Sequence, residues 1–138
     1  MIQYIDFLFF FRLKTKNKFF LKKIGKTNGC VNIGEIVSDH INENEKIFLK
    51  IDIEGSEYEI LDQIVSIKDK IQGLIIEFHN VSKNLDIIEN FLKKIKDYLN
   101  LVHIHANNYS VKDANEFPEA IELSISSIDL NNLDLDDV

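Results

Sequence analysis

The fold of this 138-residue chain is decided by residues 50–61, which read Lys50-Ile51-Asp52-Ile53-Glu54-Gly55-Ser56-Glu57-Tyr58-Glu59-Ile60-Leu61. Apolar and polar side chains alternate over residues 47–53, and this pattern predicts a strand. Gly55 follows, and Ser56 with Glu59 forms a capping box that predicts a helix to about Ile71. Its expected buried side chains are Tyr58, Leu61, Ile64 and Val65.

Helices and strands continue to alternate outward from this stretch. Residues 31–41 predict a short helix that Asn32 caps. Residues 74–79 begin with an unbroken apolar run, which predicts a strand buried on both faces by helices. Between residues 85 and 99 the apolar period is 3.6, and the expected helix buries Leu85, Ile88, Phe91, Leu92, Ile95, Tyr98 and Leu99.

Two more strands are expected near the carboxyl end. Residues 101–106 predict one strand, with Val102, Ile104 and Ala106 on one face and both His103 and His105 on the other. Residues 121–126 predict another after Pro118. Strands that alternate with helices of about 15 residues are typical of an α/β fold whose parallel sheet has right-handed crossovers.

Composition limits the functional classes. The chain suffices for one domain, and its single cysteine, Cys30, cannot form an internal disulfide. Residues 1–28 hold seven Lys or Arg and one acid, giving +6, whereas the remainder holds nine bases and 22 acids, giving −13 and a total of −7. An acidic main body argues against nucleic-acid binding as the principal function.

The basic, Phe-rich segment 1–28 leaves alternatives open. Its apolar run is too short to span a membrane, and its positive charges follow the run instead of preceding it as in a signal peptide. We therefore expect a cytoplasmic protein. The segment could contact a membrane surface, or residues 4–13 could add a strand to the sheet. Residues 129–138 form an acidic tail that we expect to be solvated.

Polar side chains gather where the predicted strands end, and in open α/β sheets ligands bind outside the carboxyl ends of the strands. The pairs are Asp52 with Glu54, Glu77 with His79, and His103 with His105. They could supply acid–base groups or ligands for a divalent ion, or they could simply mark where strands leave the core. No spacing matches a metal motif such as HExxH, so we expect no metal site.

The stretch from Lys50 to Leu61 resembles the signature of FkbM-type methyltransferases, approximately K-I-D-[IV]-E-G-x-E-x-x-[IVL]-L. Residues 75–79 and 101–108 are similar to later segments of that family. The resemblance implies dependence on S-adenosylmethionine and O-methylation of a small-molecule or glycan acceptor, such as a sugar or polyketide hydroxyl. It also implies a Rossmann-like class I methyltransferase sheet, of which this chain would hold strands 4-5-7-6, mostly parallel and flanked by helices.

That partial sheet sets the expected domain limits. The resemblance covers about residues 30–127, so we expect a partial domain at 29–128, the carboxyl-terminal half of such an enzyme. The family's glycine-rich turn has no match here, because Gly25, Gly29 and Gly34 do not have its spacing. We therefore expect a truncated domain that is inactive alone.

The resemblance also assigns roles to residues. It places Asp52 at the tip of a central strand beside the cofactor, with Glu54 and Gly55 as further cofactor-binding candidates. Asp52, Glu77 and His79 are the candidate catalytic bases. Glu57 and Glu59 are interpreted as acids that favour the helix macrodipole. An alternative function is a non-catalytic domain that pairs with itself or another protein through the exposed edge of residues 47–53.

Overall fold

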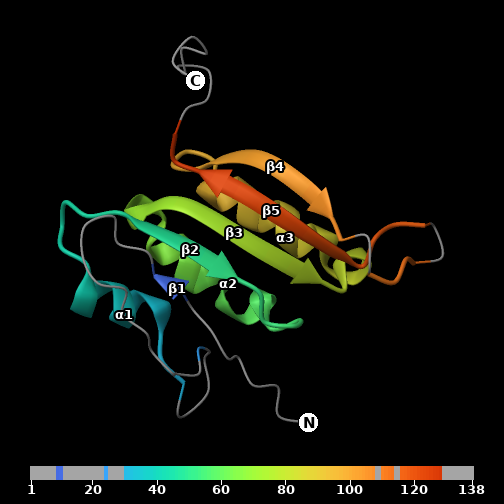
Figure 1. Ribbon diagram of the computed structural model, residues 1–138, viewed down its shortest axis with the longest axis horizontal. Coiled ribbons are helices and arrows are strands. Elements are labelled where there is room, and N and C mark those ends of the chain that lie inside the picture. Colours follow the sequence, from blue (N-terminus) through green and yellow to red (C-terminus); the bar gives the residue numbers. More distant parts are fainter. Residues whose placement is uncertain (1–8, 11–23, 25–29, 108–109, 114–115, 129–138) are drawn as a thin grey trace.

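The computed structural model describes residues 9–10, 24, 30–107, 110–113 and 116–128. They form one five-stranded sheet in the order β1-β2-β3-β5-β4 (Figure 1). The strands are β1 Phe9–Phe10, β2 Ile47–Ile51, β3 Ile71–His79, β4 Asn100–Ala106 and β5 Ala120–Ser126. The β2–β3 pairing is parallel, whereas β5 is antiparallel to both of its neighbours and β1 is antiparallel to β2. The α/β class is confirmed, and the sheet is mixed.

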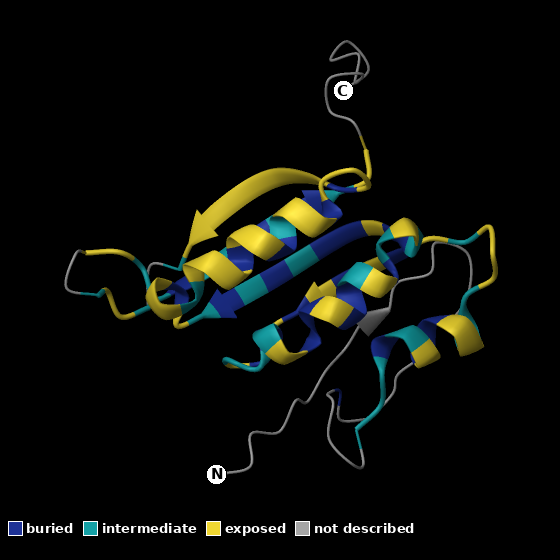
Figure 2. Ribbon diagram, turned by 180° about the vertical axis from the view of Figure 1, so that it is seen from behind, coloured by how far each residue is buried: buried dark blue, intermediate teal, exposed yellow. Residues whose placement is uncertain are grey.

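The helices are α1 Ile33–His40, α2 Glu57–Ser66 and α3 Val81–Ile95, and the short 3₁₀ helix η1, Lys68–Lys70, precedes β3. Helices α2 and α3 lie on one face of this sheet, and α1 packs against α2. Figure 1 shows the strands in front of α2 and α3, and Figure 2, from behind, shows the same helices in front of the strands. The expectation that helices bury β3 on both faces is therefore wrong within the described part of the chain.

The core lies between the sheet and these helices. Leu74, Ile76 and Phe78 of β3 are fully buried, and Phe78 meets Phe91 of α3 edge-on with ring centroids 6.3 Å apart. The buried side chains of β2 are Ile47, Leu49 and Ile51, alternate residues that share one face. Burial of each such side chain stabilises the fold by about 1.5–3 kcal/mol. The core therefore fixes which face of β2 and β3 carries the remaining, polar side chains.

Several boundaries and caps differ from those predicted. Asn32 caps α1 as expected, since its side chain accepts a hydrogen bond of 2.7 Å from the Gly34 N–H. The predicted Ser56 cap of α2 is wrong, because the Ser56 side chain makes no capping bond. In α3, Leu85 is exposed, as is Tyr98 after the helix, because the face of α3 that meets the sheet is narrower than the apolar stripe in the sequence.

The opposite face of the sheet is open along the described residues. At the amino-terminal ends of β2 and β3 it forms a groove of about 1040 Å³. Phe48 lies there directly over Gly73, where a Cβ atom would stand 2.6 Å from the Phe48 ring. Val102 also lines this groove, at an irregularity in the β4–β5 register. This irregularity interrupts the strict alternation from which Val102 and Ile104 were predicted to share one face of the strand.

The structure tests only part of what the sequence predicted for the basic, Phe-rich segment 1–28. Phe9 and Phe10 pair with Lys50 and Leu49, so a short strand from the Phe-rich segment does cover the edge of β2. Apart from Phe9, Phe10 and the buried Ile24, the proposed membrane-contact segment 1–28 lies outside the described residues, as does the acidic tail 129–138. Among the described residues, no helix has the length and apolar character that crossing a membrane requires.

Candidate functional site

The candidate site lies at the carboxyl ends of β2 and β3. Ile51, the last residue of β2, pairs with Ile76 in the parallel register, whereas β3 continues through Glu77, which pairs with Glu122 of β5, to His79. Asp52, the first residue after β2, therefore lies level with Glu77 on the neighbouring strand. After Asp52 the chain turns sharply through Glu54, with φ 53°, and Gly55, with φ 101°. The second value strongly favours glycine, as the tight exit predicted from the sequence requires.

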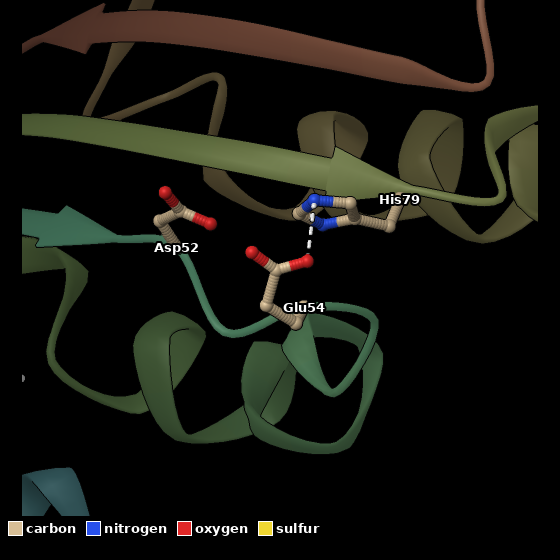
Figure 3. Close-up of side chains that lie close together, drawn as sticks. All are labelled: Asp52, Glu54 and His79. Atoms are coloured by element: carbon tan, nitrogen blue, oxygen red, sulfur yellow. Dashed lines mark ion pairs between the residues drawn. The ribbon is translucent and has the colours of Figure 1, made fainter. Parts of the chain in front are cut away.

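His79, the last residue of β3, is the centre of this site (Figure 3). Its Nε2 atom lies 3.5 Å from Glu54 Oε2 and 3.9 Å from Glu77 Oε1. The Asp52 carboxylate lies close to the same pair, and ligand atoms of Asp52, Glu54 and His79 are within 4.8 Å of one another. Two carboxylates from the turn after β2 thus approach an imidazole from β3 at the rim of the sheet.

Glu57 holds the other side of the imidazole, and its role was missed by the sequence interpretation. Its side chain is completely buried at the start of α2, and Oε1 lies 3.0 Å from His79 Nδ1. The same oxygen accepts hydrogen bonds from the Ile53 N–H at 3.2 Å and the Gly55 N–H at 3.1 Å. Glu57 therefore fixes the turn and orients His79 so that Nε2 faces the rim.

Two further hydrogen bonds position the strand end. The Tyr58 hydroxyl donates to the His79 carbonyl oxygen at 2.7 Å, and Asn107 donates from Nδ2 to Glu77 Oε1 at 2.9 Å. Burial, with the nearby Glu57 charge, raises the pKa of Tyr58 to about 12, so its hydroxyl remains a donor at neutral pH. His79 is consequently held both by its ring, through Glu57, and by its backbone carbonyl, through Tyr58.

The carboxylates at the rim influence one another. Partial burial, followed by the charges of Glu77 and Glu54, raises the pKa of Asp52 above its ordinary value. An acid with a raised pKa is a better proton acceptor, so this shift suits a base.

The two remaining predicted histidines are not brought to this cluster. His103 and His105 on β4 pair with Ser124 and Glu122 of β5. Because β5 separates β4 from β3, His105 lies two strands from Glu77, or about 10 Å away. The two rings stack on each other with centroids 6.3 Å apart.

Comparison with known proteins fixes the family to which these residues belong. Residues 17–113, more than half of the chain, match the methyltransferase FkbM domain family. The chain belongs to this family. No curated protein and no solved structure matches the chain. The strand end with Asp52, the turn and the start of α2 all lie inside the matched range of the FkbM domain.

Membership of a methyltransferase family implies S-adenosylmethionine as the methyl donor in general terms. The described rim offers groups that suit this cofactor, since Glu54 is 76% exposed and Asp52 is exposed beside it. Carboxylates accept hydrogen bonds from an ammonium group or from ribose hydroxyls, both of which the cofactor carries. Asp52 and Glu54 therefore offer hydrogen-bond acceptors of the kind that the donors of this cofactor require.

Proposed function

We propose that this FkbM domain transfers the methyl group of S-adenosylmethionine to a hydroxyl of a small-molecule or glycan acceptor. The observation that carries the proposal is the pairing of His79 with the buried Glu57 at 3.0 Å. A histidine whose Nδ1 is bonded to a carboxylate presents Nε2 as a proton acceptor, and this arrangement suits a general base.

The chain's residues would act as follows. Asp52 and Glu54, with the Gly55 turn, would contact the cofactor. His79 would remove the acceptor's proton while the acceptor oxygen attacks the methyl carbon and the carbon–sulfur bond breaks, leaving S-adenosylhomocysteine. Asp52 and Glu77 lie beside this imidazole as further acids of the rim and would stabilise the imidazolium that forms. Positioning of the two reactants would supply much of the acceleration.

The open sheet face bears on activity in isolation. Within the described residues, helices cover the sheet on one side only, and Phe48, Lys50 and Val102 are exposed on strands of the sheet. A methyl transfer site gains from exclusion of water, and an uncovered face supplies one wall of such a site. We therefore infer that the chain alone binds the cofactor weakly and turns over slowly.

The test separates cofactor binding from catalysis. Calorimetric titration with S-adenosylmethionine measures binding, and mass spectrometry of a panel of sugar, glycan and polyketide hydroxyls measures transfer. His79→Ala should abolish transfer while retaining cofactor binding, whereas His103→Ala, a histidine two strands away, should leave both unchanged. Absence of binding at millimolar cofactor, or equal transfer by the His79 variant, would contradict the proposal.

A second candidate function rests on β4. All seven residues of this edge strand, Asn100–Ala106, are exposed, including Leu101, Val102 and Ile104. An exposed apolar edge favours pairing with another chain, so we propose β4 as the edge through which a homo-oligomer would form. The β2 edge that the sequence suggested for this role is covered in part by β1. Gel filtration tests it: a dimer that Ile104→Lys converts to a monomer supports pairing, and a monomeric parent chain rejects it.

A further inference from the structure

The cluster of Asp52, Glu54 and His79 contains side chains that can bind a metal ion as well as accept a proton. Three residues converge, Asp52 and Glu54 from the turn and His79 from β3, and each offers one ligand atom within 4.8 Å of the others (Figure 3). Ligands bound at about 2.1 Å to one ion lie roughly 3.0–3.4 Å apart at octahedral or tetrahedral angles, so the ligand atoms, now within 4.8 Å of one another, need to close by up to about 1.4–1.8 Å. Glu54, which is 76% exposed, can make this movement by rotating its side chain.

The second observation concerns Glu57, which lies behind the imidazole. Histidines that bind metals almost always donate their other ring nitrogen to a carboxylate or carbonyl, which orients the free nitrogen toward the ion. Here His79 Nδ1 lies 3.0 Å from Glu57 Oε1, and Nε2 faces Glu54. The Glu57 side chain is fully buried, and within the described part of the chain its second oxygen, Oε2, has no hydrogen-bond partner.

Charge at the site favours a cation. Glu54, Glu57 and Glu77 all lie within 4.0 Å of the same imidazole, and Asp52 stands beside them. Even a protonated His79 therefore supplies one positive charge against four carboxyl groups. A divalent ion at the rim would relieve the repulsion among these acids.

We propose that Asp52, Glu54 and His79 bind one divalent first-row transition-metal ion, with Glu57 holding His79 in the ligand orientation. An imidazole with two carboxylates favours an ion of the Zn²⁺ or Mn²⁺ class over Ca²⁺ and Mg²⁺, which prefer oxygen ligands alone. Three protein ligands leave coordination positions open for water or for an acceptor hydroxyl, whose pKa the ion would lower.

This site goes beyond the proposed function and does not depend on it. Nε2 cannot accept a proton while it coordinates an ion, so His79 would act as the base only in the metal-free chain, and in the loaded chain the ion would lower the pKa of the acceptor hydroxyl. Glu77, held by Asn107 outside the three ligands, would then be the nearest carboxylate to take the proton. Metal binding itself is measurable without cofactor or acceptor, so its failure is distinguishable from failure of methyl transfer.

The experiment titrates the full chain with Mn²⁺ and follows free Mn²⁺ by electron paramagnetic resonance. We expect one ion bound per chain, displaced by Zn²⁺. Asp52→Asn and His79→Ala should each lower the affinity at least tenfold, and Glu57→Gln should lower it about 10–100-fold, because a neutral amide oxygen orients and polarises the imidazole less strongly than the carboxylate does. Glu122→Gln, an acid on β5 paired with Lys50, and His103→Ala are matched controls that should bind as the parent does.

Circular dichroism of each variant checks that it is folded, and the conservative Asp52→Asn change keeps the test valid if His79→Ala unfolds. Three results would overturn the proposal. They are no Mn²⁺ binding at millimolar concentration, equal affinity in Asp52→Asn and the parent chain, and equal losses in the control variants, which would mean dispersed binding to surface acids.

Discussion

Glu57 is the residue whose replacement should affect both the site and the stability of the fold. Its Oε1 accepts from the Ile53 and Gly55 N–H groups and contacts His79 Nδ1, and the side chain has no exposed surface. Glu57→Ala leaves two backbone donors without partners, and each unsatisfied buried donor costs about 1–3 kcal/mol. Water can reach His79, which is 21% exposed, so the imidazole is not counted. With the cavity included, we expect a loss of about 3–4 kcal/mol.

Glu57→Gln provides the conservative comparison. The amide oxygen can still accept the two backbone hydrogen bonds but without a charge, so the expected loss is about 1–2 kcal/mol. Glu59→Ala is the matched control, since Glu59 is an exposed acid in the same first turn of α2 and should cost about 0.5 kcal/mol.

Urea unfolding followed by circular dichroism measures these differences. With a slope near 1.5 kcal/mol per molar, Glu57→Ala should lower the unfolding midpoint by about 2 M, at an unchanged slope. A shift equal to that of Glu59→Ala would refute the reasoning, because it would mean that the three contacts of Glu57 Oε1 contribute no net free energy to the folded chain.

Three further predictions concern neighbouring positions. Gly73→Ala should destabilise the fold, because the new Cβ would stand 2.6 Å from the Phe48 ring; Phe48→Ala should remove most of this cost, and a double-mutant cycle in urea that finds no coupling would contradict it. Gly55→Ala should cost about 1–3 kcal/mol in the same assay, because φ 101° is unfavourable for alanine although the Cβ would meet only Asn80 at 3.6 Å; an unchanged midpoint would count against this. Tyr58→Phe should cost about 1 kcal/mol through the lost bond to the His79 carbonyl. Since the folded-state pKa of Tyr58 is raised to about 12, the parent chain should also lose stability as pH rises from about 10 toward 12, and the loss should be smaller in Tyr58→Phe; equal pH dependence in thermal melts would argue against it.

The regular elements could be predicted from the sequence because each depends on local periodicity. Alternation over residues 47–53 indicated β2, which ends two residues earlier at Ile51, and the apolar period over residues 85–99 indicated α3, which begins at Val81 and ends at Ile95. Periodicity does not show which faces of the sheet the helices cover. The apolar start of β3 suggested helices on both sides, whereas in the described part of the chain one face carries an open groove in which the Phe48 ring lies over Gly73.

Some of the site residues could be predicted from the sequence, and others could not. Asp52, Glu54, Glu77 and His79 meet because strand ends in parallel register meet, and this rule requires only strand assignments. His103 and His105 obey the same alternation but lie across β5, and their distance from the cluster depends on strand order instead of on residue spacing. Residue spacing alone therefore does not show which side chains from different strands lie close together, because that depends on the order of the strands in the sheet.

Glu57 shows why the most important contact could not be found by pattern. An acid at the first position of a helix has a sufficient local explanation in the macrodipole, and Ser56 with Glu59 has the spacing of a capping box. In the structure Ser56 has ψ near 5°, outside the extended region that a capping side chain needs, and the positive φ values of Glu54 and Gly55 accompany the bonds from Ile53 and Gly55 to Glu57 instead. The third contact comes from His79, 22 residues away. One buried carboxylate thereby joins the turn, the helix start and the end of β3, so any substitution that changes the orientation of His79 through Glu57 should also change stability. Activity and metal affinity of Glu57 variants therefore have to be compared at temperatures where each variant is fully folded.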